Sequence, residues 1–361
     1  MTGGEPVIPS PNRPSLLFDW SVTNESRSPR ERISVFLEWA RLFLLLSLLA
    51  GSLSAQQAQP LKPDNVTRED WTTLSIGGLS WQSYPPMPGG TVERPEFTRE
   101  LVRLQWRFGD PVDVVVVRPH GVAKPRVVLY LYGYPSDMSR FMFDQWSKTA
   151  TEDGFAAVGF VSALTGDRYR NRPMKEWFVS QLQESLGTTT HDVQMVLNYL
   201  EKRGDLNMDR VGMYGEGSGA AIAILAASAD PRIAVLDLMD PWGGWPDWLK
   251  QSPLVPEKER EAYLRPEFLD KVANLDPVKI LPRLTTQVIR LQQVKAYRIT
   301  PPSVAEKITA AVPPKAQLLQ SEDWASYRKT WEEKKIWNWV KDQLERLPVR
   351  TAALPAGESR N

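Results

Sequence analysis

Residues 215–219, Gly-Glu-Gly-Ser-Gly, form the segment whose residue types and spacing point most directly to chemistry. They stand between an apolar run at 211–214 and an Ala-rich run that starts near Ala220, which predicts a strand, a tight turn and a helix. Glycines two positions before and after the centre let the turn bend sharply and the helix pack closely on the strand. Such a turn displays its central side chain above the strand end. Here the centre is Gly217, which has no side chain and cannot act as a nucleophile.

The chain has two histidines and no cysteine in 361 residues, which limits the chemistry available to it. Without a thiol there is no disulfide, zinc–thiolate site, iron–sulfur cluster or cysteine nucleophile. Because most general bases are imidazoles, such a site would have to use His120, His191 or a carboxylate. His120 is expected in a surface loop. His191 is expected to open a helix with Asp192 as first-turn capping residues, the alternative being a substitute base near the turn.

Ser218 and four carboxylates are the remaining polar candidates near predicted strand ends. Ser218 is interpreted as the N-cap of the following helix, which serine favours, with a displaced nucleophile as the alternative. The carboxylates are Glu216, Asp240, Glu322 and Asp323. Carboxylates that converge on one pocket can bind a metal or transfer protons. Their spacing matches no metal motif, so we expect solvated or structural roles, no metal and no cofactor.

Three tryptophans, Trp242, Trp245 and Trp248, directly follow another predicted strand. Aromatic rings at a strand end can stack on a sugar, peptide or lipid. We favour the simpler interpretation, in which they pack a small helical cap against the sheet.

The elements that must position these residues alternate between strands and helices. Strands are predicted at residues 101–108, 112–119, 126–134, 155–164, 211–214, 233–241, 287–293 and 315–322. Helices are predicted at 141–154, 191–204, from 220 onward, 304–312 and 327–344, with 242–282 helical in pieces. The first two strands are joined by Gly109-Asp110, a hairpin signal. The fold class is therefore α/β, a mostly parallel sheet with an antiparallel N-terminal edge and helices on both faces.

The N-terminal region reads as a targeting segment. Residues 42–55 are a short apolar run that ends in small residues, typical of a secretory signal cleaved after Ala55. It is shorter than the roughly 20 apolar residues of a membrane span, and an uncleaved membrane anchor is the alternative. Residues 1–41 are expected to be a disordered or misassigned extension, 56–97 an arm or linker, 98–347 the folded domain with 242–282 as a cap insertion, and 348–361 a disordered tail.

The charge balance excludes some partners. There are 44 Lys+Arg and 43 Asp+Glu, a formal net charge of +1. This gives no large uniform field for nucleic acid or a membrane surface.

Several segments together resemble the α/β-hydrolase superfamily, and within it the dienelactone-hydrolase and prolyl-oligopeptidase-like esterase branch. The resemblance covers roughly residues 101–346. It rests on the Gly-rich turn, on VVLYLYGYP as strand and oxyanion loop, on HDVQMVLNYLEKRGDLNMDRVGMYG as the lead-in to the turn, and on PVKILPRL and RITPP before the acid-bearing turn. It implies an α/β-hydrolase fold.

The resemblance also implies where a catalytic triad would stand. The nucleophile position falls on Gly217, the acid position at about Tyr297, and the base position in the stretch that ends at Trp324. No histidine follows His191 in the sequence. The backbone amides of Tyr134 and Ser218 would remain as an anion-binding corner.

We therefore expect an exported, secreted or periplasmic, α/β-hydrolase-like pseudoenzyme that binds a small hydrophobic or ester-like ligand or a protein partner. The expected ligand-binding residues are Gly133, Tyr134, Gly217, Ser218 and Trp242. One alternative is an active serine esterase or peptidase-like hydrolase with a rearranged site that uses Ser218, for example with His191. Another is a structural domain with a filled pocket and no ligand.

Overall fold

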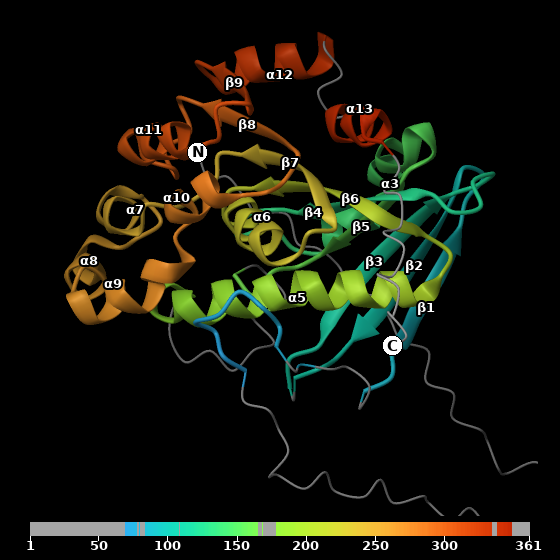
Figure 1. Cartoon of the computed structure of the whole chain (residues 1–361), viewed down its shortest axis with the longest axis horizontal. Helices are drawn as coiled ribbons and strands as arrows, with labels where there is room; N and C mark the ends of the chain where they lie inside the picture. Colours follow the sequence, from blue (N-terminus) through green and yellow to red (C-terminus); the bar gives the residue numbers. More distant parts are fainter. Residues whose placement is uncertain are drawn as a thin grey trace, which may run out of the picture. The chain divides into compact units, whose positions relative to one another are not determined.

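The computed structural model describes residues 69–77, 79, 84–107, 109–164, 168, 178–333 and 338–348 (Figure 1). Within these residues, nine strands form one sheet in the order β1-β2-β3-β5-β4-β6-β7-β8-β9. The strands are β1 (Met87–Glu93), β2 (Phe97–Leu104), β3 (Val112–Pro119), β4 (Arg126–Leu131), β5 (Ala156–Phe160), β6 (Asn207–Glu216), β7 (Ile233–Met239), β8 (Val288–Val294) and β9 (Gln317–Ser321). The predicted segments 1–41 and 42–55, and residues 349–361 of the predicted tail, lie outside the described residues.

The pairing of the strands confirms the predicted sheet. Neighbours from β1 to β5 along the sheet are antiparallel, and all neighbours from β5 to β9 are parallel. Every residue of β5 and β7 is buried. Parallel strands are buried in this way because helices cover both faces of the sheet, which explains their nearly continuous apolar sequences.

The α-helices are α2 (Ser139–Met142), α3 (Asp144–Thr151), α5 (Leu182–Arg203), α6 (Ser218–Ala229), α7 (Trp245–Gln251), α8 (Glu257–Tyr263), α9 (Pro266–Val272), α10 (Pro277–Ile280), α11 (Pro302–Ala311), α12 (Trp324–Glu333) and α13 (Trp339–Arg346). Short 3₁₀ turns are η2 (Glu152–Gly154), η3 (Phe178–Gln181), η4 (Ala273–Leu275) and η5 (Leu281–Arg283). The region 242–282 is thus helical in pieces, as predicted. Across the described part of the chain, none of the helices has the length and apolarity needed to span a membrane.

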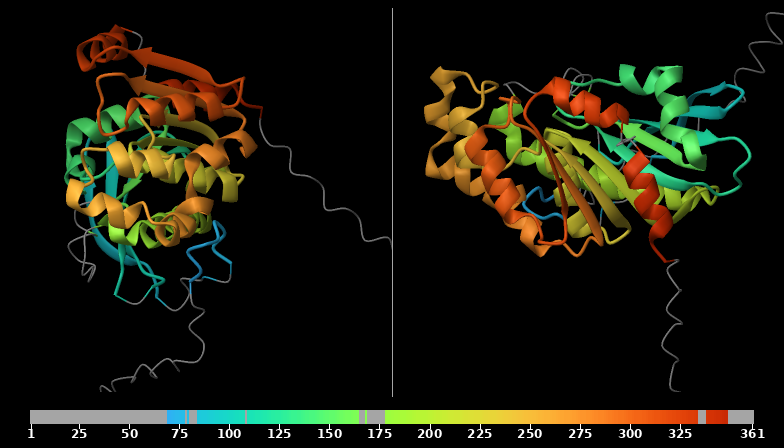
Figure 2. Two further views of the ribbon diagram at one scale, coloured as in Figure 1. Left: turned by 90° about the vertical axis from the view of Figure 1, so that its left-hand side faces the viewer. Right: turned by 90° about the horizontal axis from the view of Figure 1, so that it is seen from above.

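The helices form one layer on each face of the sheet (Figure 2). The apolar stretch of α6 packs with β4, β6 and β7 on one face, and α5 lies next to α6. On the other face, α3 and α13 cover Val128, Tyr130 and Val235. Contact with α13 is close, because a Cβ on Gly212 of β6 would lie 2.3 Å from Val340 Cγ1. The sheet therefore lies between two apolar cores.

Three elements differ from the sequence prediction. Residues 87–93, predicted as part of an arm, form β1, which pairs with β2 after a register shift between Pro88 and Gly90. The predicted closing helix at 327–344 is two helices, α12 and α13, on either side of residues 334–337, which lie outside the described residues. The third difference concerns α5.

Helix α5 begins at Leu182 rather than at His191, so His191 lies in its middle and does not cap its first turn. The preceding threonines have low helix propensity, which favoured a loop. In the structure, the hydroxyls of Thr189 and Thr190 donate to the carbonyls of Ser185 and Leu186, each at 2.8 Å. These bonds satisfy the buried hydroxyls, and burial of the threonines overrides their low helix propensity.

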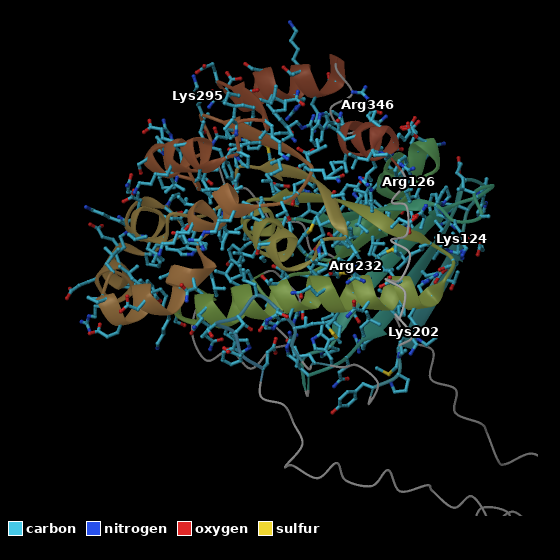
Figure 3. All side chains as sticks on the ribbon, in the orientation of Figure 1. Lys124, Arg126, Lys202, Arg232, Lys295 and Arg346 are labelled. Atoms are coloured by element: carbon cyan, nitrogen blue, oxygen red, sulfur yellow. The ribbon has the colours of Figure 1, made fainter. Side chains whose placement is uncertain are left out.

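The two ends of the parallel strands carry different parts of the molecule (Figure 3). Lys295 follows β8 at the carboxyl end, whereas Arg126 begins β4 at the amino end. The loops at the carboxyl end contain the turn at 217 and the segments after β7, β8 and β9. In open parallel sheets, ligands bind at this edge.

Candidate functional site

The turn between β6 and α6, here called the elbow, is sharp, and its central residue, Gly217, has no side chain. Gly217 has φ 54° and ψ −114°, a conformation that favours glycine because other residues clash there. Its N–H donates to the carbonyl of Met239 at 2.8 Å, and its carbonyl accepts the N–H of Trp242 at 3.2 Å. The loop after β7 thus holds the turn in place from both sides.

The flanking glycines are needed for close packing, as predicted. A Cβ on Gly219 would lie 2.0 Å from the carbonyl oxygen of Leu131, and one on Gly215 would lie 2.6 Å from Ala220 Cα. Both distances are far below van der Waals contact, so the start of α6 approaches β4 and β6 as closely as the backbone allows. The sharp turn is therefore maintained by packing.

Ser218 is buried and engaged by the backbone, and it is the first residue of α6 and not its N-cap. The N-cap is Gly217, which has no side chain to accept a capping bond. The Ser218 hydroxyl accepts the N–H of Tyr134 at 2.9 Å. This bond links α6 to the loop after β4, and it corrects the expectation that the Tyr134 amide is directed at an external anion.

Trp242 lies beside the position where a side chain at residue 217 would project. A Cβ built on Gly217 would be 3.2 Å from Trp242 Nε1 and 3.9 Å from Gly133 Cα. Trp242, Trp245 and Trp248 are all buried, and the rings of Trp242 and Trp248 have centroids 4.6 Å apart. The packing interpretation of these tryptophans is confirmed. The structure brings Gly133, Gly217 and Trp242 together.

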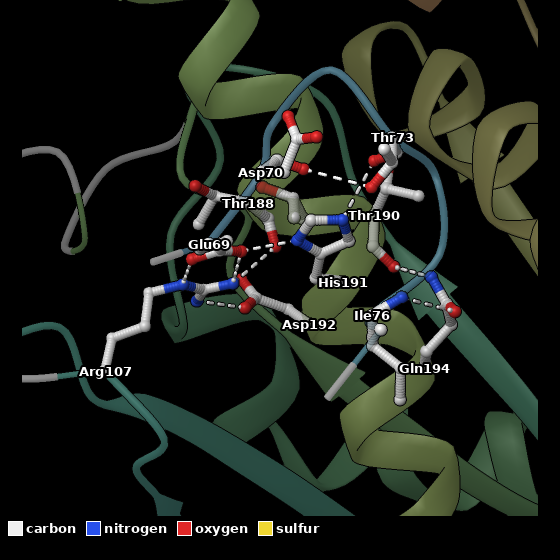
Figure 4. Close-up of polar contacts among 12 residues, drawn as sticks. Glu69, Asp70, Thr73, Ile76, Arg107, Thr188, Thr190, His191, Asp192 and Gln194 are labelled. Carbon is white, nitrogen blue, oxygen red and sulfur yellow. Dashed lines mark hydrogen bonds and ion pairs between the residues drawn. The ribbon is translucent and has the colours of Figure 1, made fainter. Parts of the chain in front are cut away.

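The two histidines are engaged elsewhere. His191 is 1% exposed, its Nδ1 contacts Glu69 Oε1, and its Nε2 lies 2.9 Å from the carbonyl oxygen of Thr73 (Figure 4). Because both ring nitrogens meet the segment 69–77, the structure does not pair His191 with Ser218. His120 lies in an exposed loop, as predicted, with Nδ1 3.0 Å from the carbonyl oxygen of Pro95.

Charged groups surround His191 in the same network (Figure 4). Arg107 contacts Glu69 and Asp192, and Arg168 contacts Asp192. Burial alone would raise the pKa of Glu69, but the hydrogen bonds and charges of Arg107 and His191 lower it to about 2. The network joins the segment 69–77 to α5 and to the chain after β2, and its geometry is that of a structural clamp.

The positions matched to the acid and the base of a triad lie next to each other. Tyr297 follows β8 and Trp324 begins α12, and their ring centroids are 5.7 Å apart at an interplanar angle of 89°. Tyr327 extends the contact, with its ring centroid 5.7 Å from that of Trp324 at 90°. Aromatic rings therefore stand where the resemblance would place a carboxylate and an imidazole.

Two carboxylates lie at the same edge of the sheet. Glu216 ends β6, and Arg140 Nη1 lies 3.4 Å from its Oε2. Asp240 follows β7 with a positive φ of 42°, and its Oδ1 accepts the N–H of Val294 at 3.0 Å. In the part of the chain that the structure describes, its Oδ2 has no hydrogen-bond partner. Burial raises the pKa of Asp240 to about 8, and the charge of Glu216 adds to the rise.

The other two carboxylates have structural surroundings. Glu322 contacts Lys295 at 2.6 Å, and Asp323 Oδ1 accepts the N–H and the hydroxyl of Ser326, each at 2.7 Å. These contacts agree with the predicted solvated or structural roles. Among the described residues, no group of three metal-ligating side chains could hold an ion.

The aromatic residues near Glu216 are not among the residues predicted for the site. Tyr132 directly follows β4, and the Arg140 guanidinium carbon is 4.0 Å from its ring centroid. The signal was present as the alternation of Tyr130 and Tyr132 and as aromatics at positions 324, 327 and 331, which share one face of a helix.

Comparisons with known proteins identify the fold. No family model and no curated protein matches the chain. An acetyl xylan esterase from Paenibacillus sp. R4 superposes with a TM-score of 0.58 at 15% identity, over 71% of this chain and 88% of that one. A cold-adapted esterase from an Arctic intertidal metagenomic library gives 0.52 at 18% identity, over 74% and 100%. The acylaminoacyl peptidase of Pyrococcus horikoshii gives 0.53 at 12%, over 73% of this chain but 44% of that one.

At these identities the likeness concerns the fold. The chain has an α/β-hydrolase fold, as the resemblance implied, with a mostly parallel sheet, antiparallel edge strands and helices on both faces.

Proposed function

We propose that this protein is a non-catalytic member of the α/β-hydrolase fold that binds a ligand or partner at the carboxyl edge of its sheet. The observation that carries the proposal is the intact elbow at Gly217, where the backbone has the required strained conformation but no side chain is present. A fold that keeps this turn without its attacking oxygen retains the binding edge and lacks the reaction centre.

The surroundings of the elbow support the same proposal. The hydroxyl nearest in sequence, that of Ser218, is buried and accepts the Tyr134 amide. The buried imidazole of His191 contacts Glu69 and Thr73. A serine nucleophile needs a general base within hydrogen-bond distance. Ser218 and His191 make their hydrogen bonds to other residues, so they do not form a nucleophile–base pair. This arrangement argues against the esterase or peptidase that would use Ser218 with His191.

Export is the second part of the proposal. It rests on the apolar segment at 42–55 and the small residues that end it. The protein would act outside the cytoplasm, as a secreted or periplasmic protein, or at a membrane where the segment is retained. Expression of the full chain in a bacterium, followed by fractionation and N-terminal sequencing, tests it. A new N-terminus after Ala55 in the exported fraction is expected, and full-length chain confined to the cytoplasm would overturn it.

Hydrolysis of p-nitrophenyl acetate and butyrate tests the absence of catalysis. The wild-type chain is expected to match its Ser218→Ala variant and to show no more than the rate that binding alone confers. Turnover that saturates with substrate and disappears in Ser218→Ala would overturn the proposal. The Glu306→Gln variant, on an exposed position of α11, is the matched control for nonspecific surface hydrolysis.

A further inference from the structure

The carboxyl edge of the sheet carries one carboxylate, that of Glu216, and a group of aromatic rings from α12 and the segment after β8. Glu216 on β6, Met239 on β7 and Gln292 on β8 form one row across the sheet by their register. The hydroxyl of Tyr327 donates to Gln292 Oε1 at 3.1 Å, which brings α12 to this row. Trp324 contacts Tyr327 on one side and Tyr297 on the other, through the two perpendicular ring contacts described above.

The charge of Glu216 acts on this group of rings. Burial is the largest cause that raises the pKa of Tyr297, and the charge of Glu216 is the second largest. The same charge also helps to raise the pKa of Tyr327. Burial raises the pKa of Tyr132 to about 12, and the charge of Glu216 adds to this rise. A hydrogen bond from Trp146 and the charge of Arg140 act in the opposite direction. The phenols therefore stay neutral, and Glu216 has a side chain 32% exposed to solvent.

A cation already occupies one part of this edge. The Arg140 guanidinium stacks 4.0 Å above the ring of Tyr132 while its Nη1 lies 3.4 Å from Glu216. An aromatic face combined with a carboxylate is the surrounding that an organic cation prefers. Arg140 is itself exposed, so it can swing away or be replaced by another cation.

There is open space next to two of the rings, those of Trp324 and Tyr327 on α12. A depression of about 370 Å³ is lined by Trp324, Tyr327, Arg328, Trp331 and Glu332. Its volume falls within the range of about 300–1,000 Å³ for small-molecule sites. Trp324 is 42% exposed, an unusual exposure for the largest apolar side chain. Asp240 supplies a second carboxyl near the row, 97% buried, with an oxygen that has no partner among the described residues.

We infer that this edge binds a small organic ammonium ion, held by the Glu216 carboxylate and by the faces of Tyr297, Trp324 and Tyr327. The inference rests on the proposed function, because it names the ligand class of the same binding edge. A neutral ligand of equal shape would lose the attraction to Glu216 and to the ring faces, so the site discriminates by charge.

Calorimetric titration of the full chain with choline and with 3,3-dimethyl-1-butanol, its uncharged isostere, tests the inference at constant ionic strength. Choline is expected to bind at least about 10-fold more tightly than the alcohol. Glu216→Gln is expected to weaken choline binding about 10-fold and to leave alcohol binding unchanged. Trp324→Leu, which removes the ring and keeps an apolar side chain, is expected to weaken both the selectivity and the affinity, with circular dichroism checking that the variant is folded.

Arg140→Ala separates a cation site from an anion site. Removal of the competing guanidinium is expected to strengthen choline binding several-fold. Weaker binding in Arg140→Ala, equal affinity for choline and the alcohol, or no binding of either would overturn the inference. Each of these results leaves the ester assay negative and the proposed function standing. Ester turnover that depends on Ser218 would instead defeat the proposed function, whatever choline does.

Discussion

At the scale of single residues, the turn at 217 depends on glycines, because side chains at these positions would clash or strain the backbone. Gly219 packs its Cα against the backbone of β4, and Gly217 has a backbone conformation that side chains rarely adopt. These requirements belong to the fold and remain when the nucleophile is absent. This explains why a sequence with glycine at the centre can keep the glycines on both sides.

The Gly219→Ala variant tests this packing. The added Cβ would lie 2.0 Å from the Leu131 carbonyl oxygen, so α6 must move and the free energy of unfolding should fall by about 3 kcal/mol. Urea denaturation followed by circular dichroism measures the loss. Ser228→Ala, at an exposed position of the same helix, is the control and should change stability by less than about 0.5 kcal/mol. Equal stability of both variants would show that the turn is loosely packed.

Asp240 gives a pH-dependent prediction at the same scale. The folded chain keeps a proton on Asp240 up to about pH 8, whereas the unfolded chain releases it near its ordinary pKa of about 4. The unfolded chain therefore binds fewer protons, and Asp240 lowers stability progressively as the pH rises from about 4 to 8. Asp240→Asn removes this effect and keeps an oxygen for the Val294 amide.

We expect Asp240→Asn to match the wild type near pH 4 and to exceed its free energy of unfolding by about 2–4 kcal/mol at pH 8. Denaturation at the two pH values measures the difference. A constant difference across the range would mean that Asp240 is ionised throughout.

At the scale of elements, helix α5 and the segment 69–77 form a unit that sequence patterns did not reveal. The Trp71 backbone lies against α5 so closely that a Cβ on Gly187 would be 2.7 Å from the Trp71 carbonyl oxygen. Gln194 donates to the carbonyl of Leu74 at 2.7 Å, and Glu69 contacts Arg107 and His191. The segment therefore belongs to the folded structure.

Glu69→Gln should release this segment. Loss of a buried carboxylate that faces Arg107 and His191 is expected to cost about 2–3 kcal/mol of stability. Hydrogen exchange should show faster exchange in residues 69–77 and in the middle of α5, with α13 unaffected. The exposed substitution Glu306→Gln should change neither measurement. Unchanged protection in Glu69→Gln would contradict the clamp.

The sequence predicts the elements that have strong periodicity or sharp end signals. The parallel strands, the hairpin at Gly109-Asp110 and the end of α5 at Gly204 follow from apolar runs and glycine positions, and the structure confirms them. It does not predict the start of α5, because three threonines oppose a helix locally and are stabilised only by burial. The clamp partners of His191 are distant in sequence and leave no local pattern.

The site is predictable to a similar extent. The missing side chain at position 217 can be read from one residue, Gly217, in a turn that the sequence predicts. The backbone conformation of Gly217 agrees with the predicted tight turn. The contact between Arg140 and Tyr132, and the ring contacts of Tyr297, Trp324 and Tyr327, join four separate segments. Such contacts depend on the strand order and register, which a single sequence does not specify.

At the scale of the whole molecule, the proposed function separates binding from catalysis. The sheet, its two helical layers and the edge at the carboxyl ends of the strands are complete in the described residues. The reacting group that this architecture would display at 217 is missing, and the two imidazoles are used in structural contacts. We therefore expect the protein to recognise a ligand at this edge and to leave it chemically unchanged.

Intact-mass spectrometry after incubation with a fluorophosphonate probe tests this central claim most directly, because the probe forms a covalent adduct with an activated serine. An unmodified mass is predicted for the wild-type chain under conditions that label a known serine esterase completely. An adduct that maps to Ser218, or to any other side chain at the carboxyl edge of the sheet, would contradict the account.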